Sequence, residues 1–281
     1  MSIKYAERKT KLIRENNRSA DFTTPNIVIN CPMNCVYCYQ HRHDDSNNIS
    51  VATNIPDLMQ NILNHRNKLG IKKPNQCDSK YWIYDIGCST DLSRVAKYFD
   101  WKKVFQFAVD NDLKFTFATK WYNKEFLTFD SKKKVRIRLS LLPERMSNLM
   151  DKGTHPLEMR LRAMKELSDS YEIHVNFSPI IYYEEWLEDY KELFQKVKEL
   201  NINDLQAECI FLNHEYKKHL RNTENYPEAE KYLWQPEIQE SKKSQYGGEN
   251  IRYKWQLKAQ WIEEFKQLVK QELNIPIRYI F

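Results

Sequence analysis

Three cysteines stand within eight residues of the chain, in the order Cys31, Cys35 and Cys38. Thiolates at this close spacing bind metals, and three of them can ligate three irons of a four-iron cluster. The fourth iron is then open to a ligand from outside the protein, which suits a cluster that performs chemistry. A structural zinc ion with His41 or His43 as its fourth ligand is the alternative.

An alternation of strand-like and helix-like segments predicts the scaffold that positions these cysteines. Apolar periodicity indicates strands at 26–30, 81–86, 114–118, 135–140, 172–178 and 205–211. It indicates helices at 54–69, 93–111, 156–168, 183–200 and 257–273. We therefore predict an α/β protein with a partial (β/α)6 TIM-like barrel, whose active site gathers at the carboxyl ends of the strands.

One segment departs from this alternation. Residues 214–254 contain Pro227, Pro236 and the pair Gly247-Gly248, and they predict an excursion with a hairpin around 246–253. The expected organisation is an N-terminal extension over 1–23 and one barrel domain over 24–281 that includes the excursion.

The composition limits the class of protein. The chain has 281 residues, a net charge of +6 and six cysteines. It shows neither a secretory signal nor the roughly 20 apolar residues of a membrane helix, so we expect a cytoplasmic protein with reduced thiols. Cys77 and Cys209 have no motif neighbours and are expected to be structural.

Basic residues cluster along the chain, above all in the run Lys132, Lys133, Lys134, Arg136 and Arg138. Such runs suit a polyanion, and they are also typical of solvated surface. Charge therefore supports binding of a nucleic acid without deciding it.

The spacing C-x3-C-x2-C, with Tyr37 before the last cysteine, resembles the signature of radical S-adenosylmethionine enzymes. From about Thr24 onward the chain further resembles the spore photoproduct lyase family. The segments that carry this resemblance are Cys88-Ser89-Thr90-Asp91, Ala118-Thr119-Lys120, Arg138-Leu139-Ser140, Pro179-Ile180, Leu193-Phe194-Gln195 and the 246–253 hairpin.

The resemblance implies a DNA repair lyase that reverts a methylene-bridged thymine dimer, the spore photoproduct, to two thymines. In that family a [4Fe-4S] cluster reduces S-adenosyl-L-methionine to methionine and a 5'-deoxyadenosyl radical, which removes a hydrogen atom from the lesion. The cluster ligands are then Cys31, Cys35 and Cys38.

The resemblance further implies that Cys88 quenches the remaining thymine radical by hydrogen transfer, and that Tyr37 and Tyr39 pass the radical back. Taken without it, a cysteine at a strand end is typical of a small buried residue. The two tyrosines could equally be packing aromatics.

The resemblance also implies a binding site for S-adenosylmethionine, formed by Thr90, Asp91, Lys120, Ser140 and Pro179. A carboxylate and an ammonium suit the zwitterionic methionine end of the cofactor, and Pro179 would border the adenine. Taken alone, Lys120 is typical of a solvated surface lysine.

A lesion inside a duplex must be turned out of the base stack before a buried site can act on it. The hairpin combines aromatic and basic residues with glycines, which suits a wedge that contacts the DNA backbone. We therefore predict nucleic-acid contacts at Tyr246, Arg252, Tyr253 and Lys254, although the hairpin could simply pack on the barrel. An electron donor such as flavodoxin or ferredoxin is the other partner implied.

Two departures from the family leave the substrate open. Only about 30 residues precede Cys31, so the N-terminal region that the spore enzymes have is expected to be largely missing. Leu142 stands where the spore enzymes have an asparagine. A related radical enzyme acting on another nucleobase, a nucleotide or tRNA is therefore a second interpretation. A zinc-containing nucleic-acid-binding module is the third, and a colourless anaerobic preparation would indicate it.

Overall fold

The computed structural model describes residues 2–16, 19, 21–38, 48–69, 78, 80–215, 224–243 and 249–281. These residues belong to two compact units. The first unit comprises the described residues of 1–32, 45–139 and 162–174, and the second comprises those of 33–44, 140–161 and 175–281. Within the described ranges, no helix combines the length and the apolar character needed to cross a membrane.

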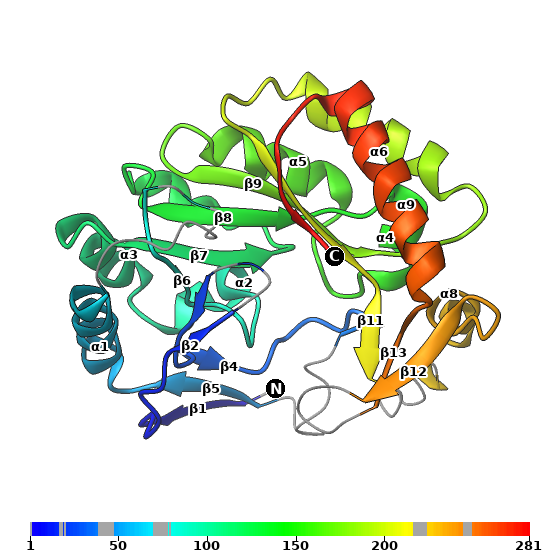
Figure 1. Cartoon of the computed structure of the whole chain (residues 1–281). Helices are drawn as coiled ribbons and strands as arrows, with labels where there is room; N and C mark the ends of the chain where they lie inside the picture. Colours follow the sequence, from blue (N-terminus) through cyan, green and yellow to red (C-terminus); the bar gives the residue numbers. More distant parts are fainter. Residues whose placement is uncertain are drawn as a thin grey trace. The chain divides into compact units, whose positions relative to one another are not determined.

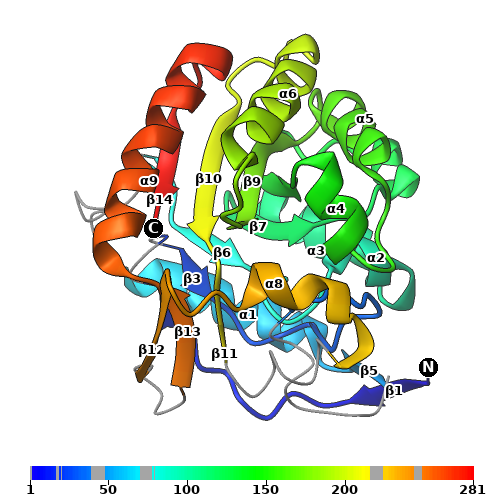
Figure 2. The ribbon, with the colours of Figure 1, turned by 90° about the vertical axis from the view of Figure 1, so that its right-hand side faces the viewer.

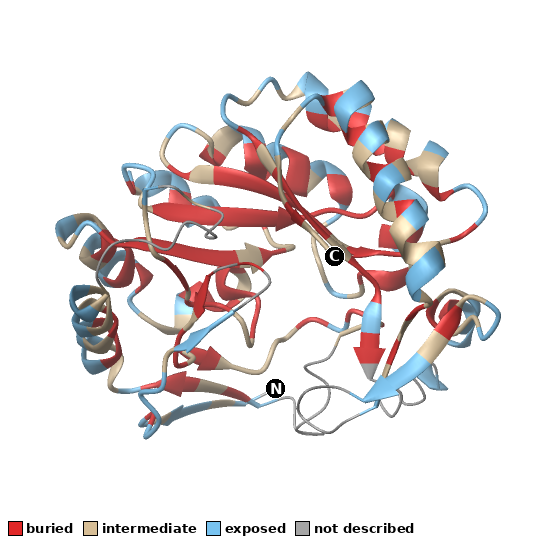
Figure 3. Ribbon diagram, in the orientation of Figure 1, coloured by how far each residue is buried: buried red, intermediate tan, exposed pale blue. Residues whose placement is uncertain are grey.

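The main sheet of the first unit has the strand order β2-β3-β6-β7-β8. These strands are Arg14–Glu15, Phe22–Thr23, Ile83–Asp85, Lys114–Thr119 and Val135–Ser140. From β3 to β8 neighbouring strands are parallel, and β7 and β8 lie side by side in Figure 1. Figure 3 shows β7 buried along almost its whole length, as expected for a parallel strand covered on both faces.

A second sheet of this unit corrects one prediction. Its order is β1-β5-β4, with bounds Ile3–Ala6, Ile49–Ala52 and Val28–Ile29. The 26–30 run, expected as the first barrel strand, thus pairs with β5, and β3 takes the place beside β6. Stacking of Phe22 on Tyr84 of β6, with ring centroids 5.4 Å apart, favours this choice. Periodicity cannot distinguish two short apolar runs that compete for one distant partner.

The helices of the first unit follow the predicted segments, with one interruption. They are α1 (Ile55–Lys68), α2 (Leu92–Val95), η2 (Ala96–Tyr98), α3 (Trp101–Asp110) and the 3-10 turn η3 (Lys124–Thr128). The helix predicted at 93–111 is broken at Phe99, whose backbone is extended. Asp100 then starts α3 by accepting a hydrogen bond from the Lys103 N–H at 3.2 Å, because aspartate is a favoured N-cap residue.

The basic run at 132–138 does not form a continuous charged surface. Arg136 and Arg138 on β8 are buried and pair with acidic residues of the same unit, whereas Lys132 is exposed. All six residues of β8 are buried, because a parallel strand in a sheet covered on both faces exposes neither of its sides. Arg136 and Arg138 therefore form ion pairs inside the protein and do not add positive charge to its surface.

The second unit has three neighbouring sheet strands in the order β14-β10-β9, with bounds Ile277–Ile280, Gln206–Phe211 and Glu172–Ile180. The first residues of β9 belong to the first unit. The helices are α4 (Glu144–Met150), α5 (Leu157–Leu167), α6 (Trp186–Glu199), α8 (Glu230–Leu233) and α9 (Trp255–Leu268), with the short helical turns η4 (Pro227–Ala229) and η5 (Val269–Leu273). β14, which the periodicity did not reveal, pairs in parallel with β10.

Aromatic side chains fix α6 and α9 to each other and to the strands of this unit. The ring of Phe265 on α9 lies 5.0 Å from that of Tyr190 on α6 and 6.3 Å from that of Phe211 on β10. Figure 2 shows the two helices beside β10 and β14. The predicted helices at 183–200 and 257–273 are confirmed because their apolar residues recur at helical spacing and form this core.

The predicted excursion contains a three-stranded antiparallel sheet of order β11-β13-β12. Its strands are Asn213–Glu215, Glu249–Tyr253 and Gln239–Lys243. The hairpin is thus longer than predicted, since its first strand precedes Tyr246. Tyr246 itself lies outside the described residues.

Candidate active site

In the first unit, predicted site residues follow the carboxyl ends of β6 and β7. Cys88, Thr90 and Asp91 come after β6, and Lys120 comes directly after β7. The Thr90 hydroxyl donates a hydrogen bond of 2.8 Å to the carbonyl of Asn30, the residue before Cys31. This bond joins the loop that carries Cys88 to the start of the cysteine motif.

The Cys88 thiol is held in one orientation. Its Sγ donates to Asn26 Oδ1 at 3.1 Å. The preceding turn is fixed by Asp85, which accepts from the Gly87 N–H at 3.0 Å and from Arg138 at 2.6 Å. Gly87 is required there because a Cβ would lie only 2.7 Å from the Cβ of Phe117.

Burial, followed by the negative charge of Asp85, raises the pKa of Cys88 to about 12, although Ser89 and Arg138 oppose the shift. The thiol therefore stays protonated around neutral pH. A protonated thiol is a poor nucleophile. It retains the hydrogen atom that a quenching reaction needs.

Replacing Asp85 with asparagine should lower the pKa of Cys88, because the substitution removes a negative charge and leaves the Arg138 charge unbalanced. We expect iodoacetamide to modify Cys88 at pH 9 about tenfold faster, since each pKa unit changes the thiolate fraction tenfold. Mass spectrometry of the Cys88 peptide measures the rate. Asp110→Asn, at an exposed position of α3, is the matched control, and equal rates in both variants would contradict the role of Asp85.

Asp91 is engaged by the protein itself. One carboxylate oxygen accepts from Thr119 Oγ1 at 2.7 Å and caps α2 through the Arg94 N–H, and the other accepts from the Lys120 N–H at 2.6 Å. Asp91 thus fixes the backbone that carries Lys120. Its direct contact with a cofactor stays a prediction.

In the second unit, Cys35 and Cys38 share one turn, in which the Cys38 N–H donates to the Cys35 carbonyl at 2.9 Å. The N–H groups of Asn34 and Val36 donate to the carbonyls of Lys152 and Met150, each at 2.9 Å. The loop thereby bonds to the last residue of α4 and to the turn that follows the helix. The cysteine loop is consequently anchored by backbone bonds.

The donor set of the motif is chemically suited to an iron-sulfur cluster. None of Cys31, Cys35 and Cys38 is in a disulfide, and thiolates are the ligands such clusters require. Cys31 belongs to the first unit and the other two to the second. Among the described residues no group of three metal-binding side chains is already assembled. His41, His43 and Tyr39 lie outside the described part of the chain.

Ser140, at the end of β8, is held through both its side chain and its backbone. Its Oγ accepts from Asn176 Nδ2 at 3.0 Å, and its carbonyl accepts from Arg160 at 3.0 Å. Within the described chain, the buried Asn176 Oδ1 has no hydrogen-bond partner. Sequence reasoning missed Asn176, although an asparagine inside the apolar run of β9 was a signal. Pro179 is buried further along β9.

The described hairpin residues differ in what they present to solvent. Arg252 donates twice to Glu240 Oε1, at 2.9 and 2.7 Å, and Lys254 donates to the Glu237 carbonyl at 2.8 Å. Tyr253 is fully buried, and its hydroxyl accepts from the Tyr182 N–H. Its ring is therefore part of the core and does not face a ligand at the surface. The neighbouring Trp255, which the sequence analysis did not select, is 64% exposed.

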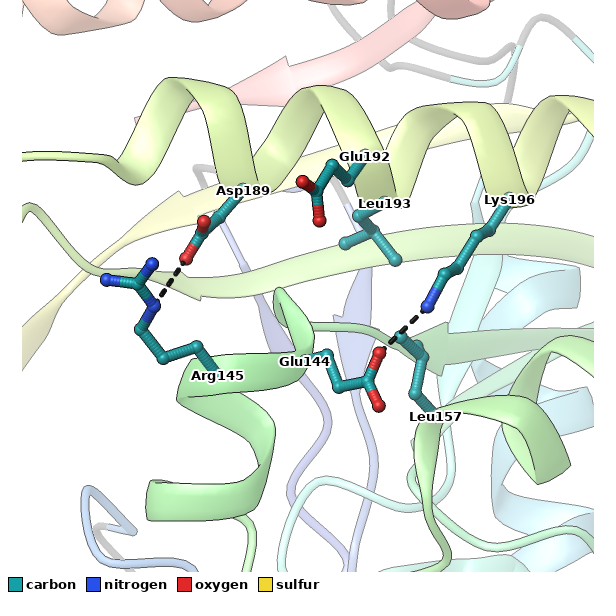
Figure 4. Close-up of a pocket in the computed structure, with 7 residues that line it drawn as sticks. All are labelled: Glu144, Arg145, Leu157, Asp189, Glu192, Leu193 and Lys196. Atoms are coloured by element: carbon teal, nitrogen blue, oxygen red, sulfur yellow. Dashed lines mark hydrogen bonds and ion pairs between the residues drawn. The ribbon is translucent and has the colours of Figure 1, made fainter.

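A pocket of about 200 Å³ between α4 and α6 contains none of the predicted site residues. Figure 4 shows that four of its charged side chains form two pairs, with Arg145 3.1 Å from Asp189 and Lys196 2.8 Å from Glu144. Because these pairs are already neutralised, the pocket is not a candidate for the active site.

Comparison with known proteins identifies relatives over nearly the whole chain. A family model described as spore photoproduct lyase matches residues 3–279. The spore photoproduct lyase of Bacillus subtilis (strain 168) is 25% identical over 258 residues, which cover 88% of this chain and 69% of that protein. The Clostridium acetobutylicum enzyme of the same name is 24% identical over 209 residues, covering 73% of this chain and 59% of that protein.

Solved structures support the fold. A spore photoproduct lyase mutant with bound AdoMet and dinucleoside spore photoproduct superposes with a TM-score of 0.86 at 19% identity, covering 99% of this chain and 82% of that chain. Streptococcus suis SuiB matches with a TM-score of 0.53 at 15% identity, covering 92% of this chain and 48% of that one. The predicted α/β fold of partial-barrel type is confirmed by the first match. Given the family model's match over 3–279, the chain belongs to the spore photoproduct lyase family.

Proposed function

We propose that this protein is a radical S-adenosylmethionine lyase that reverts the spore photoproduct in DNA to two thymines. Family membership over 3–279 supports the reaction, as does a relative of the same fold that was solved with AdoMet and the dinucleoside lesion. The observation that carries the proposal is the Cys88 thiol, held by Asn26 on a loop bonded to the residue before Cys31.

Cys31, Cys35 and Cys38 would hold a [4Fe-4S] cluster, and Thr90, Lys120, Ser140 and Pro179 would surround S-adenosylmethionine. When bound, these groups supply the radical chemistry that removes a hydrogen atom from the lesion. Asp91 contributes by fixing the Lys120 backbone. The buried oxygen of Asn176, beside Ser140, suits an N–H or O–H group of the cofactor.

Cys88 completes the repair by hydrogen transfer. Its S–H bond breaks, a C–H bond forms on the thymine radical, and the unpaired electron remains on sulfur. The O–H hydrogen of Tyr37 then restores the thiol and leaves the unpaired electron on the tyrosine, with Tyr39 as the second predicted carrier. Burial, with the Asp151 charge next in effect, raises the pKa of Tyr37, so its hydroxyl is protonated and has this hydrogen to give.

DNA and an electron donor are the partners of the proposed reaction. Arg252 and Lys254 are half-exposed beside the hairpin, where they can reach phosphates once Glu240 releases the arginine. Electrons for the cluster would come from a flavodoxin or a ferredoxin.

The test is anaerobic reconstitution with iron and sulfide, followed by reaction with S-adenosylmethionine, dithionite and a synthetic methylene-bridged thymine dinucleotide. Wild type should convert the dinucleotide to one with two intact thymines. Cys88→Ala should restore at least about tenfold fewer thymines and give diverted products, because cofactor cleavage continues without a hydrogen donor. Cys209→Ala, at a buried cysteine of β10, should behave as wild type.

Two outcomes would overturn the proposal. If the wild-type protein cleaves the cofactor but restores no thymines, it is a radical enzyme that acts on another substrate. If the protein is colourless, contains zinc and does not cleave S-adenosylmethionine, the proposal that it is a radical enzyme is wrong.

A further inference from the structure

Arg160 on α5 is almost completely buried, with 1% of its surface exposed. All five of its N–H donors are used. Nε donates to the His155 carbonyl at 2.7 Å, Nη1 to the Ser140 carbonyl at 3.0 Å and to Asp151 at 2.7 Å, and Nη2 to Ser147 at 3.0 Å and Thr154 at 2.9 Å. A buried guanidinium requires such compensation, because an unpaired buried charge is strongly unfavourable.

The acceptors of Arg160 lead to the cysteine loop. Asp151, at the end of α4, accepts from Arg160 through one carboxylate oxygen and from the Tyr37 hydroxyl through the other. Tyr37 lies between Cys35 and Cys38. The neighbouring carbonyls of Met150 and Lys152 accept the backbone bonds of the loop. The guanidinium thus fixes the segment on which the loop rests.

A further bond from Arg160 leads to the predicted cofactor site. Nη1 holds the Ser140 carbonyl at the end of β8, while Asn176 holds the Ser140 hydroxyl. One planar group therefore bonds both to the segment beneath the cysteine loop and to the strand end that carries Ser140. Lysine cannot reproduce this arrangement because it lacks the rigid fork of donors.

We propose that Arg160 is a positioning residue that sets the cysteine loop and Ser140 in one geometry, so that cluster retention and cofactor binding depend on the same side chain. This inference rests on the proposed cluster and cofactor sites. It does not depend on which substrate is repaired.

The experiment compares Arg160→Met with Arg162→Met, a matched control two residues along α5 whose side chain is 55% exposed and pairs with Glu166. The readouts are the half-life of the cluster absorbance in limited air and the Kd for S-adenosylmethionine, followed by the change in the EPR signal of the reduced cluster. We expect Arg160→Met to shorten the half-life and weaken the Kd by about tenfold each, as is typical of residues that support metal ligands. The control should change neither.

Two milder variants separate the two branches. Tyr37→Phe removes the bond to Asp151 and should shorten the cluster half-life without changing the cofactor Kd. Asn176→Leu removes both the bond to Ser140 and the proposed contact of the Asn176 oxygen with the cofactor, and it should weaken the Kd without changing the half-life. If Arg160→Met does not fold, Arg160→Lys decides the proposal, because lysine keeps the positive charge but lacks the rigid fork of donors. A wild-type half-life and Kd in Arg160→Lys would refute the proposal.

The inference is overturned if folded Arg160→Met keeps the wild-type cluster half-life and Kd. It is also overturned if Leu157→Ala, which removes a buried apolar side chain of α5 and none of the Arg160 bonds, gives the same losses, because Arg160 would then act through stability alone. Neither readout requires the lesion. If the wild-type protein retains a cluster and binds the cofactor but restores no thymines, the proposed substrate is rejected and this inference stands.

Discussion

Replacing Cys35 with alanine is expected to lower thymine formation to less than about one thousandth of wild type, because two thiolates do not retain a catalytic four-iron cluster. Cys35 is buried, and its backbone carbonyl closes the turn with Cys38. Alanine keeps that backbone bond and removes only the thiolate. The loss should therefore come from the metal site and leave the fold intact.

Iron and sulfide content, the EPR spectrum of the reduced protein and the thymine yield measure this effect together. Circular dichroism should show the same helix content as wild type. The control is Ser89→Ala, next to Cys88 but outside the cysteine motif, which should retain its full iron content. A brown and active Cys35→Ala protein would contradict the assignment of the cluster ligands.

Replacing Glu172 with glutamine is expected to destabilise the protein by about 3 kcal/mol, the lower end of the range for breaking a buried ion pair. Glu172 begins β9 and pairs with Lys114 of β7 and Arg136 of β8, both nearly fully buried. His174 Nε2 lies 3.0 Å from the same carboxylate. Without Glu172, Lys114 loses its carboxylate partner, and Asp78 is the one acidic partner that Arg136 keeps among the described residues.

The same carboxylate should make stability depend on pH. Burial alone would raise the pKa of Glu172, but the hydrogen bond from His174 and the charges of Arg136 and Lys114 outweigh it and hold the pKa well below the usual value of 4.5. A lowered folded-state pKa gives stability that is fully present above about pH 4.5 and is lost as the pH falls further. Glu172→Gln should flatten this acid dependence.

Urea unfolding between pH 3 and pH 7 measures both effects on Glu172. The matched control is Glu125→Gln, at an exposed glutamate of the first unit, which should stay within about 0.5 kcal/mol of wild type. A Glu172→Gln protein with the stability and acid dependence of wild type would show that the cluster of charges is solvated and contributes little.

Local patterns in the sequence were enough to predict a metal site and most of the helices and strands. Spacing alone predicts that Cys31, Cys35 and Cys38 are metal ligands, because three thiolates in one loop have few other uses. The helices at 54–69 and 183–200 follow from the 3.6-residue period, which the chain records without reference to distant residues. Cys88 was predicted as the hydrogen donor only from the resemblance of the chain to a family, because a single cysteine forms no pattern.

Only the tertiary structure decided which polar residues are buried and what they contact. Arg136 reaches Asp78, Arg160 reaches Ser140, and Tyr253 enters the core, although each resembles an ordinary surface residue in the sequence. The same holds for Val28–Ile29, which pairs with β5 and not with the barrel. Periodicity describes one segment at a time, whereas these contacts join segments 20 or more residues apart, and their free energy exists only once the chain has folded.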